Sequence, residues 1–387
     1  MNPTANIIAL HQPRRLAFGA GCAARAIDDL RERHCQRVLL VASRSTRRFC
    51  EPFQSALATA GSSILVWDKI DAEPTVETFR QAMTAARDFR PDAVVGIGGG
   101  SVLDIAKLVA AMLGSDLDIR DAFGIGKISG RSIHLACLPT TAGTGSEVSP
   151  NAILLDEADQ LKKGVISPHL MPDAAYVDPA LTLSVPPAVT SATGMDALTH
   201  CIEAYANRFA HPLIDLYALQ GIRLIAQSLE QAVRHGDDLA ARTNVALGSM
   251  YGGMCLGPVN TGAVHALAYP LGGEFHIAHG VSNALLLPHV LAFNLPAAPQ
   301  RYAQIAIAMG EPMASGVSDL DTAARGVARV ADLSRRCGVP QRLSQIGIPE
   351  SAIERMAKAA MTVTRLLERN VRQVTLNDAI AIYRSAF

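Results

Sequence analysis

The chain has 387 residues, of which 49% are hydrophobic and 18% charged, the composition of a folded protein long enough for two domains. Its 35 Lys and Arg balance its 35 Asp and Glu, which argues against a protein that binds nucleic acid or an anionic membrane. Seven cysteines without a C-x-x-C pair favour reduced thiols. The N-terminus carries no signal-peptide pattern, so we expect a cytoplasmic protein.

The first half of the chain alternates buried strands with amphipathic helices. Apolar runs predict strands at residues 37–42, 62–67, 91–97 and 133–138. Helical periodicity between these runs predicts helices at residues 47–61 and 76–89. Strands that alternate with helices of this length indicate a parallel sheet with helices on both faces.

From about Pro187 onward the pattern is helical. Helices are predicted at residues 190–207, 212–235, 238–255 and 322–337, and another begins after Pro349. We therefore predict an α/β domain with a Rossmann-like parallel sheet at residues 1–187, followed by an all-helical domain at residues 188–387. We expect the active site in the cleft between the two domains.

One glycine loop has the context of a phosphate-binding turn. The segment GIGGGSVLD, residues 96–104, follows a predicted strand and opens a predicted helix. Glycines allow the backbone to approach a pyrophosphate, and the N–H groups of the following helix then face the anion. The alternative is a tight strand–helix turn without a ligand, but three consecutive glycines are a costly way to build one. We favour phosphate binding.

Two other glycine-containing segments are less specific. GAGCAA, residues 19–24, fits a dinucleotide fingerprint, but the next strand ends in Ser43 and Arg44 rather than in an acid. We interpret that match as the start of an ordinary helix. LPTTAGTGSE, residues 138–147, is rich in hydroxyl groups and follows a strand, and could either hold phosphate and nicotinamide groups or form a solvated loop.

An aspartate and three histidines indicate a metal centre. Asp196 and His200 lie four residues apart and share one face of a predicted helix, although such a pair more often forms a simple hydrogen bond. The nearly uncharged stretch 243–300, which prolines and glycines break too often for a membrane span, adds His265 and His279. Together the four would suit Fe(II), Zn(II) or another divalent ion that polarises a substrate oxygen.

Four motifs together resemble the iron-containing (group III) alcohol dehydrogenase family. They are GGGSxxD at residues 98–104, PTTAGTGSE at 139–147, GMDALxH at 194–200, and His265 with His279-Gly280. Their order and spacing are those of the family, which includes lactaldehyde reductases, 1,3-propanediol dehydrogenases and butanol dehydrogenases. The resemblance implies a nucleotide domain, a helical metal domain, Fe(II) or another divalent ion, NAD or NADP, and a homodimer or larger homo-oligomer.

The resemblance also implies roles for individual residues. It makes Asp196, His200, His265 and His279 the metal ligands and part of the catalytic set. The cofactor-binding set that it implies is Ser43, Gly98, Gly99, Gly100, Ser101, Asp104, Thr140, Thr141, Thr144, Asn151, Lys163, Thr182, Leu183 and Ser184.

The sequence departs from the family pattern at two positions. Ser43 stands where many members carry an aspartate that binds the adenosine ribose. Arg44 and Arg47 nearby either pair with a 2′-phosphate, which relaxes the preference toward NADP(H) or use of both coenzymes, or are only solvated surface residues. Tyr269 stands where several members carry a second histidine, four residues after the third ligand. His276 is our substitute candidate for a catalytic histidine.

We expect hydride transfer between NAD(P)(H) and a small alcohol or aldehyde. A maleylacetate-reductase-like or dehydroquinate-synthase-like enzyme on the same fold would need several cations at the pocket, and residues 243–300 contain no Lys or Arg. A non-catalytic nucleotide-binding protein with a structural metal is the alternative outside enzymes.

Overall fold

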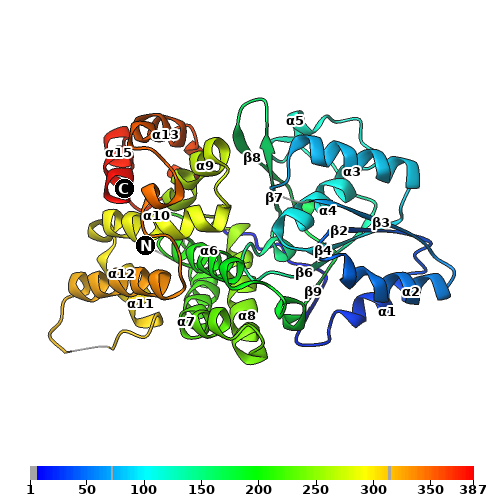
Figure 1. The fold of residues 1–387 in the computed structure, drawn as a ribbon, viewed down its shortest axis with the longest axis horizontal. Coiled ribbons are helices and arrows are strands. Elements are labelled where there is room, and N and C mark those ends of the chain that lie inside the picture. Colours follow the sequence, from blue (N-terminus) through cyan, green and yellow to red (C-terminus); the bar gives the residue numbers. More distant parts are fainter. Residues whose placement is uncertain (1–6, 71–72, 313–314) are drawn as a thin grey trace. The chain divides into compact units, whose positions relative to one another are not determined.

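The computed structural model describes residues 7–70, 73–312 and 315–387. It divides into two compact units, one formed by His11–Ser184 and the other containing Val185–Phe387 (Figure 1). The first unit holds the β-sheets, and the second is built from helices. The predicted fold class, an α/β domain followed by a helical domain, is therefore confirmed, and the predicted boundary after residue 187 lies close to the change of unit.

A six-stranded parallel sheet forms the centre of the first unit, in the order β1-β9-β6-β4-β2-β3. Its strands are β1 (Arg15–Phe18), β2 (Arg37–Ser43), β3 (Ser63–Ile70), β4 (Ala93–Gly98), β6 (His134–Pro139) and β9 (Ala174–Val177). The four strands predicted from apolar runs are β2, β3, β4 and β6, which lie side by side. The other two have four residues each, and so short a run carries little periodicity.

Helices cover both faces of this sheet. They are α1 (Ala24–Glu32), α2 (Glu51–Thr59), α3 (Val76–Phe89) and α4 (Gly100–Met112). Within β2, Val38 and Leu40 pack in the core cluster with α1 and α2, whereas Leu39 and Val41 pack in the cluster with α3 and α4. This alternation follows from the two-residue period of a strand and explains why a strand buried on both faces is apolar throughout.

The first unit also contains a smaller sheet that the sequence analysis did not predict. It has the order β5-β8-β7, with β5 (Gly124–Ile125) after the short helix α5 (Ile119–Ala122), and with β7 (Asn151–Asp156) and β8 (Leu161–Ile166). β7 and β8 form an antiparallel hairpin. The alternating burial of β7 is that of a sheet with one solvated face, and a search for continuous apolar runs does not detect such a strand.

The second unit consists of helices, and none of its described residues lies in a strand. They are α6 (Pro187–Tyr205), α7 (Pro212–Arg234), α8 (Leu239–Leu256), α9 (Ala263–Phe275), α10 (His279–Asn294), α11 (Pro299–Ala308), α12 (Asp319–Arg336), α13 (Ile353–Ala360), α14 (Thr364–Leu367) and α15 (Leu376–Ser385). A Cβ at Gly194 would come within 2.2 Å of Leu229 on α7, and one at Gly221 within 2.5 Å of Cys201 on α6. Glycine at these two positions therefore lets α6 and α7 pack closely, and the second half of α6 is buried all round.

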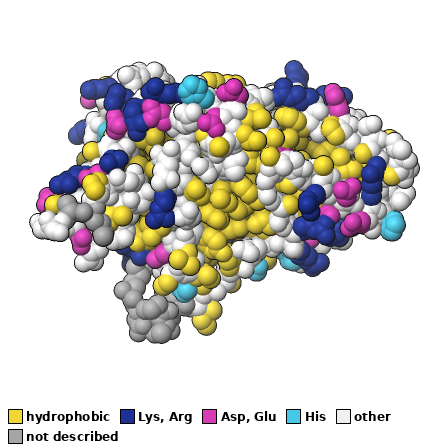
Figure 2. Space-filling view, turned by 90° about the horizontal axis from the view of Figure 1, so that it is seen from below, with side chains coloured by type: hydrophobic (Ala, Val, Ile, Leu, Met, Phe, Trp, Pro, Cys, Tyr) yellow, Lys and Arg dark blue, Asp and Glu magenta, His cyan; other side chains and the backbone are white. Residues whose placement is uncertain are grey.

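Among the residues that the structure places, no helix combines the length and the apolarity that crossing a membrane requires. On the face drawn in Figure 2, Lys and Arg side chains lie interspersed with Asp and Glu rather than gathered in one large basic patch. This mixture agrees with the zero net charge of the whole chain.

Candidate functional site

The helical unit brings four predicted metal ligands around one carboxylate. Asp196 and His200 lie one turn apart on α6, and both side chains are buried because α6 runs through the core of the unit. The Nε2 atom of His200 lies 3.9 Å from Asp196 Oδ1. The Nε2 atoms of His265, on α9, and of His279, at the start of α10, lie 3.6 and 3.8 Å from the same oxygen. Three helices therefore direct three imidazoles to one oxygen atom.

The electrostatics of this cluster favour an ionised aspartate. Burial alone would raise the pKa of the Asp196 carboxyl, but the three imidazoles, together with a hydrogen bond from Asn283, hold that pKa below its usual range. The imidazole rings of His200 and His265 stack with their centroids 4.8 Å apart, and those of His265 and His279 lie 5.2 Å apart. The cluster is thus a compact set of one anionic oxygen and three ring nitrogens.

The donor set and its spacing fit a divalent transition-metal ion. In a tetrahedral site with bonds of about 2.1 Å, ligand atoms lie about 3.4 Å apart, close to the separations found here. The ligand atoms of Asp196, His265 and His279 all lie within 4.8 Å of one another. His200 joins this group because its Nε2 atom lies 3.9 Å from Asp196 Oδ1. The His279 side chain is 27% exposed, whereas the other three are at most 6% exposed. The accessible side of the cluster is therefore the side of His279.

Glu203 is a functional candidate that the sequence analysis missed. Its Oε2 lies 2.6 Å from His265 Nδ1, and its Oε1 accepts a hydrogen bond of 2.6 Å from the backbone N–H of Val264. A carboxylate on Nδ1 leaves the lone pair of His265 on Nε2, the atom that faces Asp196. Glu203 follows His200 by three residues on the same helix, and this i, i+3 spacing is the signal by which it could have been found.

The two departures from the family pattern occupy different surroundings. Tyr269 is buried on α9, and its ring centroid lies 6.3 Å from that of His279, on the accessible side of the cluster. Burial raises the pKa of the Tyr269 hydroxyl. His276 is exposed and ends α9 with a left-handed backbone, and it is not one of the described residues that converge on Asp196. A catalytic role for His276 stays a prediction.

In the first unit, the glycine loop and the hydroxyl-rich loop lie against each other at the carboxyl ends of β4 and β6. Gly98 ends β4, Gly99 caps α4 in an extended conformation, and Gly100 begins the helix. A Cβ at Gly100 would lie 2.4 Å from the side chain of Thr144, and one at Gly99 would lie 3.3 Å from Thr141 Oγ1. Glycine at these positions therefore lets the start of α4 pack closely against Thr141 and Thr144, so the hydroxyl-rich loop lies at the N-terminal end of the helix, where the free N–H groups favour an anion such as a pyrophosphate. Thr140 joins the two loops by donating its N–H to the Gly98 carbonyl at 2.9 Å, and Ser101 is the second residue of α4.

Asp104, a predicted cofactor contact, forms hydrogen bonds with other residues of the same unit. Its carboxylate accepts hydrogen bonds from Ser146 Oγ at 2.5 Å and from the Ile153 N–H at 2.9 Å. Beside it, the fully buried Lys107 donates to the carbonyls of Ser146, Ser149 and Asn151, the first two at 2.9 Å. These contacts hold the loop that follows β6 and the start of β7. Burial raises the pKa of Asp104 and lowers that of Lys107.

Other predicted cofactor residues lie near the carboxyl ends of the strands. Ser43 Oγ contacts the hydroxyls of Ser45 and Thr46. Ser184 Oγ accepts a hydrogen bond from Arg48, and Thr182 donates its hydroxyl to the Pro179 carbonyl at 2.7 Å, with Leu183 between them. Arg47, which we expected to be available to a 2′-phosphate, forms an ion pair of 2.5 Å with Asp68 at the end of β3.

Asn151 and Lys163 both belong to the β7–β8 hairpin. Asn151 begins β7, and its Oδ1 is buried without a hydrogen-bond partner among the described residues. Lys163 pairs with Asp156 at 3.0 Å and with Asp159, so two carboxylates of its own hairpin hold its charge. Their roles toward a cofactor stay predictions.

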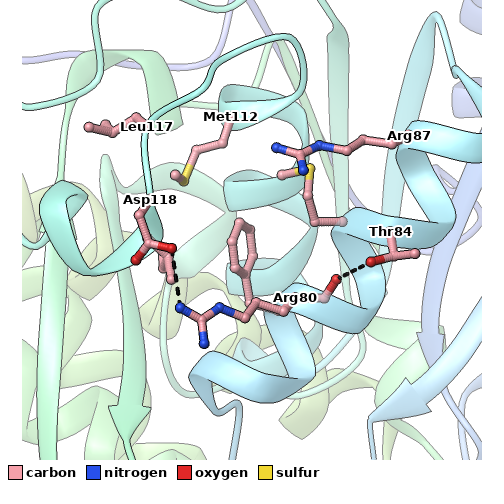
Figure 3. A pocket seen from close by; sticks show the side chains of 9 residues that line it. Arg80, Thr84, Arg87, Met112, Leu117 and Asp118 are labelled. Atoms are coloured by element: carbon pink, nitrogen blue, oxygen red, sulfur yellow. Dashed lines mark hydrogen bonds and ion pairs between the residues drawn. The ribbon is translucent and has the colours of Figure 1, made fainter.

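A separate pocket of about 270 Å³ lies beside α3 (Figure 3). Arg80, Thr84 and Arg87 line it from α3, and Arg80 reaches across it to form an ion pair of 3.1 Å with Asp118. None of its lining residues belongs to the predicted site, so we assign no role in the reaction to this pocket.

Comparisons with known proteins cover almost the whole chain. The family model of iron-containing alcohol dehydrogenase matches residues 13–179, and the C-terminal model of the Fe-containing alcohol dehydrogenase family matches residues 190–387. Long-chain-alcohol dehydrogenase 1 of Geobacillus thermodenitrificans is 42% identical over 86% of this chain and 84% of its own length. Lactaldehyde reductase of Escherichia coli is 31% identical over 96% of this chain and 97% of its own.

Solved structures share the same fold. A crystal structure of 1,3-propanediol oxidoreductase superposes with a TM-score of 0.95 at 34% identity and covers 99% of this chain and 100% of that chain. Sulfoacetaldehyde reductase from Bifidobacterium kashiwanohense, solved in complex with NAD+, gives a TM-score of 0.87 at 26% identity, with 99% of each chain covered. The similarity therefore extends over both units.

Proposed function

Because the chain belongs to the iron-containing alcohol dehydrogenase family, we propose that it transfers a hydride reversibly between NAD(P)(H) and a small alcohol or aldehyde. The observation that carries this proposal is the convergence of His200, His265 and His279 on Asp196 in a buried cluster with one accessible side. In the oxidative direction, an alcohol and NAD(P)+ give a carbonyl compound, NAD(P)H and a proton.

The four residues of the cluster would hold a divalent ion. The family favours Fe(II), and a set of one carboxylate and three imidazoles would also bind Zn(II). A bound ion would supply Lewis acidity, which lowers the pKa of an alcohol and favours its alkoxide. Two further residues of the chain shape this centre. Glu203 holds the proton of the His265 ring on Nδ1, and Tyr269 lies beside His279 on the accessible side of the cluster. The burial of Asp196 and His265 keeps bulk water from the inner side of the cluster.

We propose that the glycine and hydroxyl-rich loops bind the dinucleotide. Gly98 to Ser101 would face the pyrophosphate, and Thr140, Thr141 and Thr144 would stand beside it. The absence of a carboxylate at Ser43 favours acceptance of both NAD(H) and NADP(H). The Arg47–Asp68 ion pair supports a limited rather than a strong preference for the 2′-phosphate, because the arginine already has an anionic partner.

We further propose that the enzyme works as a homo-oligomer in the cytoplasm. Three large apolar side chains stand exposed near the start of α7: Phe209 at 50%, Leu213 at 41% and Leu216 at 70%. Such a group supports a contact with another copy, which light scattering of the purified protein would detect. All seven cysteines are free thiols and buried, as expected in a reducing compartment.

The decisive experiment follows nicotinamide absorbance in purified protein loaded with Fe(II) or Zn(II). NADH or NADPH is supplied with a panel of short aldehydes and ketones. Oxidation of the coenzyme that requires both the ion and a carbonyl compound is the expected result. If protein shown to hold the ion and to bind the coenzyme oxidises neither coenzyme with any of these compounds, the proposal is overturned.

A further inference from the structure

Asn283 places its side-chain amide among the atoms of the proposed metal centre. It lies on α10, one turn after His279, and is fully buried. Its Nδ2 lies 2.6 Å from Asp196 Oδ1, 3.1 Å from His265 Nε2 and 3.2 Å from His279 Nε2. These are three of the four atoms that would bind the ion.

The two ends of this amide are satisfied very unequally. Nδ2 has two hydrogens and three candidate acceptors, one of which is a carboxylate oxygen. Oδ1 is buried and has no hydrogen-bond partner in the part of the chain that the structure describes. A buried amide oxygen without a partner costs free energy, so this orientation requires a gain on the Nδ2 side.

The gain comes from the lone pairs of the cluster. Glu203 accepts a hydrogen bond from His265 Nδ1, which leaves a lone pair on His265 Nε2, and Asp196 Oδ1 is an acceptor oxygen 2.6 Å from the Asn283 amide nitrogen. Without a positive partner, these buried atoms would be unsatisfied acceptors. The positive end of the Asn283 amide is the group that the structure places beside them.

We propose that Asn283 stands in for the cation: it donates to the ligand atoms of the metal-free centre and competes with the ion for their lone pairs. An ion bound to Asp196, His265 and His279 takes over the acceptors that Nδ2 uses. The amide then loses partners at Nδ2 while Oδ1 stays buried. Asn283 therefore stabilises the metal-free centre more than the loaded one, keeps the ligands assembled before loading, and weakens ion binding. This inference rests on the metal centre of the proposed function.

The test compares the wild type with Asn283→Leu, which keeps the branched arrangement of four side-chain heavy atoms and removes the amide. Zn(II) affinity is measured by competition with a chelator, and melting temperature is measured with and without Zn(II). We expect Asn283→Leu to bind Zn(II) roughly tenfold more tightly, the equivalent of one hydrogen bond to a charged group. The melting temperature of the metal-free form should fall, and the rise in melting temperature on adding Zn(II) should exceed that of the wild type.

Asn294→Leu is the matched control. Asn294 lies on the same helix, eleven residues or about 16 Å further on, and is also buried. Its amide exchanges hydrogen bonds of 2.7 and 2.8 Å with Asn370. The control should lower the melting temperature of both forms alike and leave Zn(II) affinity unchanged. Asn283→Ala serves as a second variant, with the same expected direction, if the leucine variant does not fold.

The outcomes separate the inference from the proposed function. Weaker Zn(II) binding in the Asn283 variants would mean that the amide supports the bound ion, and unchanged binding would mean that it only packs; either result overturns the inference. A wild type that binds neither Zn(II) nor Fe(II) overturns the metal centre itself, and the inference with it.

Discussion

Glu203 Oε2 lies 2.6 Å from His265 Nδ1, and this contact decides which nitrogen of the imidazole faces Asp196. The two residues stand 62 positions apart in the chain, on α6 and α9. The same glutamate accepts the N–H of Val264 near the start of α9, so it orients the ring and anchors the helix that carries it.

Glu203→Gln should weaken metal binding by about 10- to 100-fold, because the amide no longer holds the imidazole as a carboxylate does. Chelator competition with Zn(II) measures the change. Glu274→Gln, which loses an exposed ion pair with Arg355 further along α9, is the control and should bind Zn(II) as the wild type does. Equal affinities for the Glu203 variant and the wild type would remove Glu203 from the metal centre.

Asp196→Ala should abolish metal binding and turnover together, because it removes the one anionic oxygen on which three imidazoles converge. Metal content after dialysis, measured beside coenzyme oxidation, tests the expectation, with circular dichroism to show that the variant is folded. A folded variant that keeps its ion and its activity would contradict the ligand assignment.

Lys107→Met should destabilise the first unit by about 3 kcal/mol or more, since it breaks a buried charge pair and leaves Asp104 without its cation. It also removes the donor to the carbonyls of Ser146, Ser149 and Asn151, so coenzyme binding should weaken while Zn(II) affinity stays unchanged. Urea unfolding and coenzyme titration measure the two effects. A variant with weakened Zn(II) binding and intact coenzyme binding would contradict this prediction, because it would show that Lys107 supports the metal centre rather than the coenzyme site.

Glu147 predicts a pH dependence of stability. Burial raises the pKa of its carboxyl from 4.5 to about 7 in the folded protein. The folded state therefore keeps a proton that the unfolded chain loses first, and stability contributed by this group falls as the pH rises from 4.5 to 7. Glu147→Gln, which mimics the protonated acid, should remove that slope in urea unfolding measured between these pH values.

Asp156 provides the internal contrast for this experiment. The pKa of the Asp156 carboxyl is lowered to about 2, and the largest cause is the hydrogen bond that it accepts from Arg120. Its contribution to stability is therefore present above pH 4 and is lost as the pH falls toward 2, the opposite sign in a different window. An Asp156→Asn variant should lose stability at neutral pH and keep the slope between pH 4.5 and 7. A Glu147→Gln variant that keeps this slope would show that another group causes it.

Asp68→Asn should shift coenzyme preference toward NADPH by several-fold, because it frees the guanidinium of Arg47 from its anionic partner. The change should be modest, since the Arg47 side chain is 58% exposed and its charge is screened by solvent. Fluorescence titration with NADPH and with NADH gives the ratio of affinities. A shift toward NADH would exclude Arg47 as a contact of the 2′-phosphate.

Much of the fold was predictable because its signals are local. The strands β2, β3, β4 and β6 are apolar runs between turn signals, and the helix at residues 76–89 begins and ends as its periodicity predicts. The β7–β8 hairpin was missed because its alternating, partly exposed strands resemble ordinary surface segments. Its place in a second sheet depends on β5, which has only two residues.

By itself, the sequence determined the family, the two-part architecture and the Asp196–His200 pair, because glycine turns and residues four apart on a helix form patterns within a few positions. His265 and His279 joined the candidate ligands through the resemblance to the family. Only the tertiary structure decided what surrounds those residues. It turned Asp104 inward to Ser146, paired Arg47 with Asp68, and brought Glu203 and Asn283 to the metal ligands. Each of these contacts joins side chains between 21 and 87 positions apart. Their partners are chosen by helix packing and burial, which no short stretch of sequence contains.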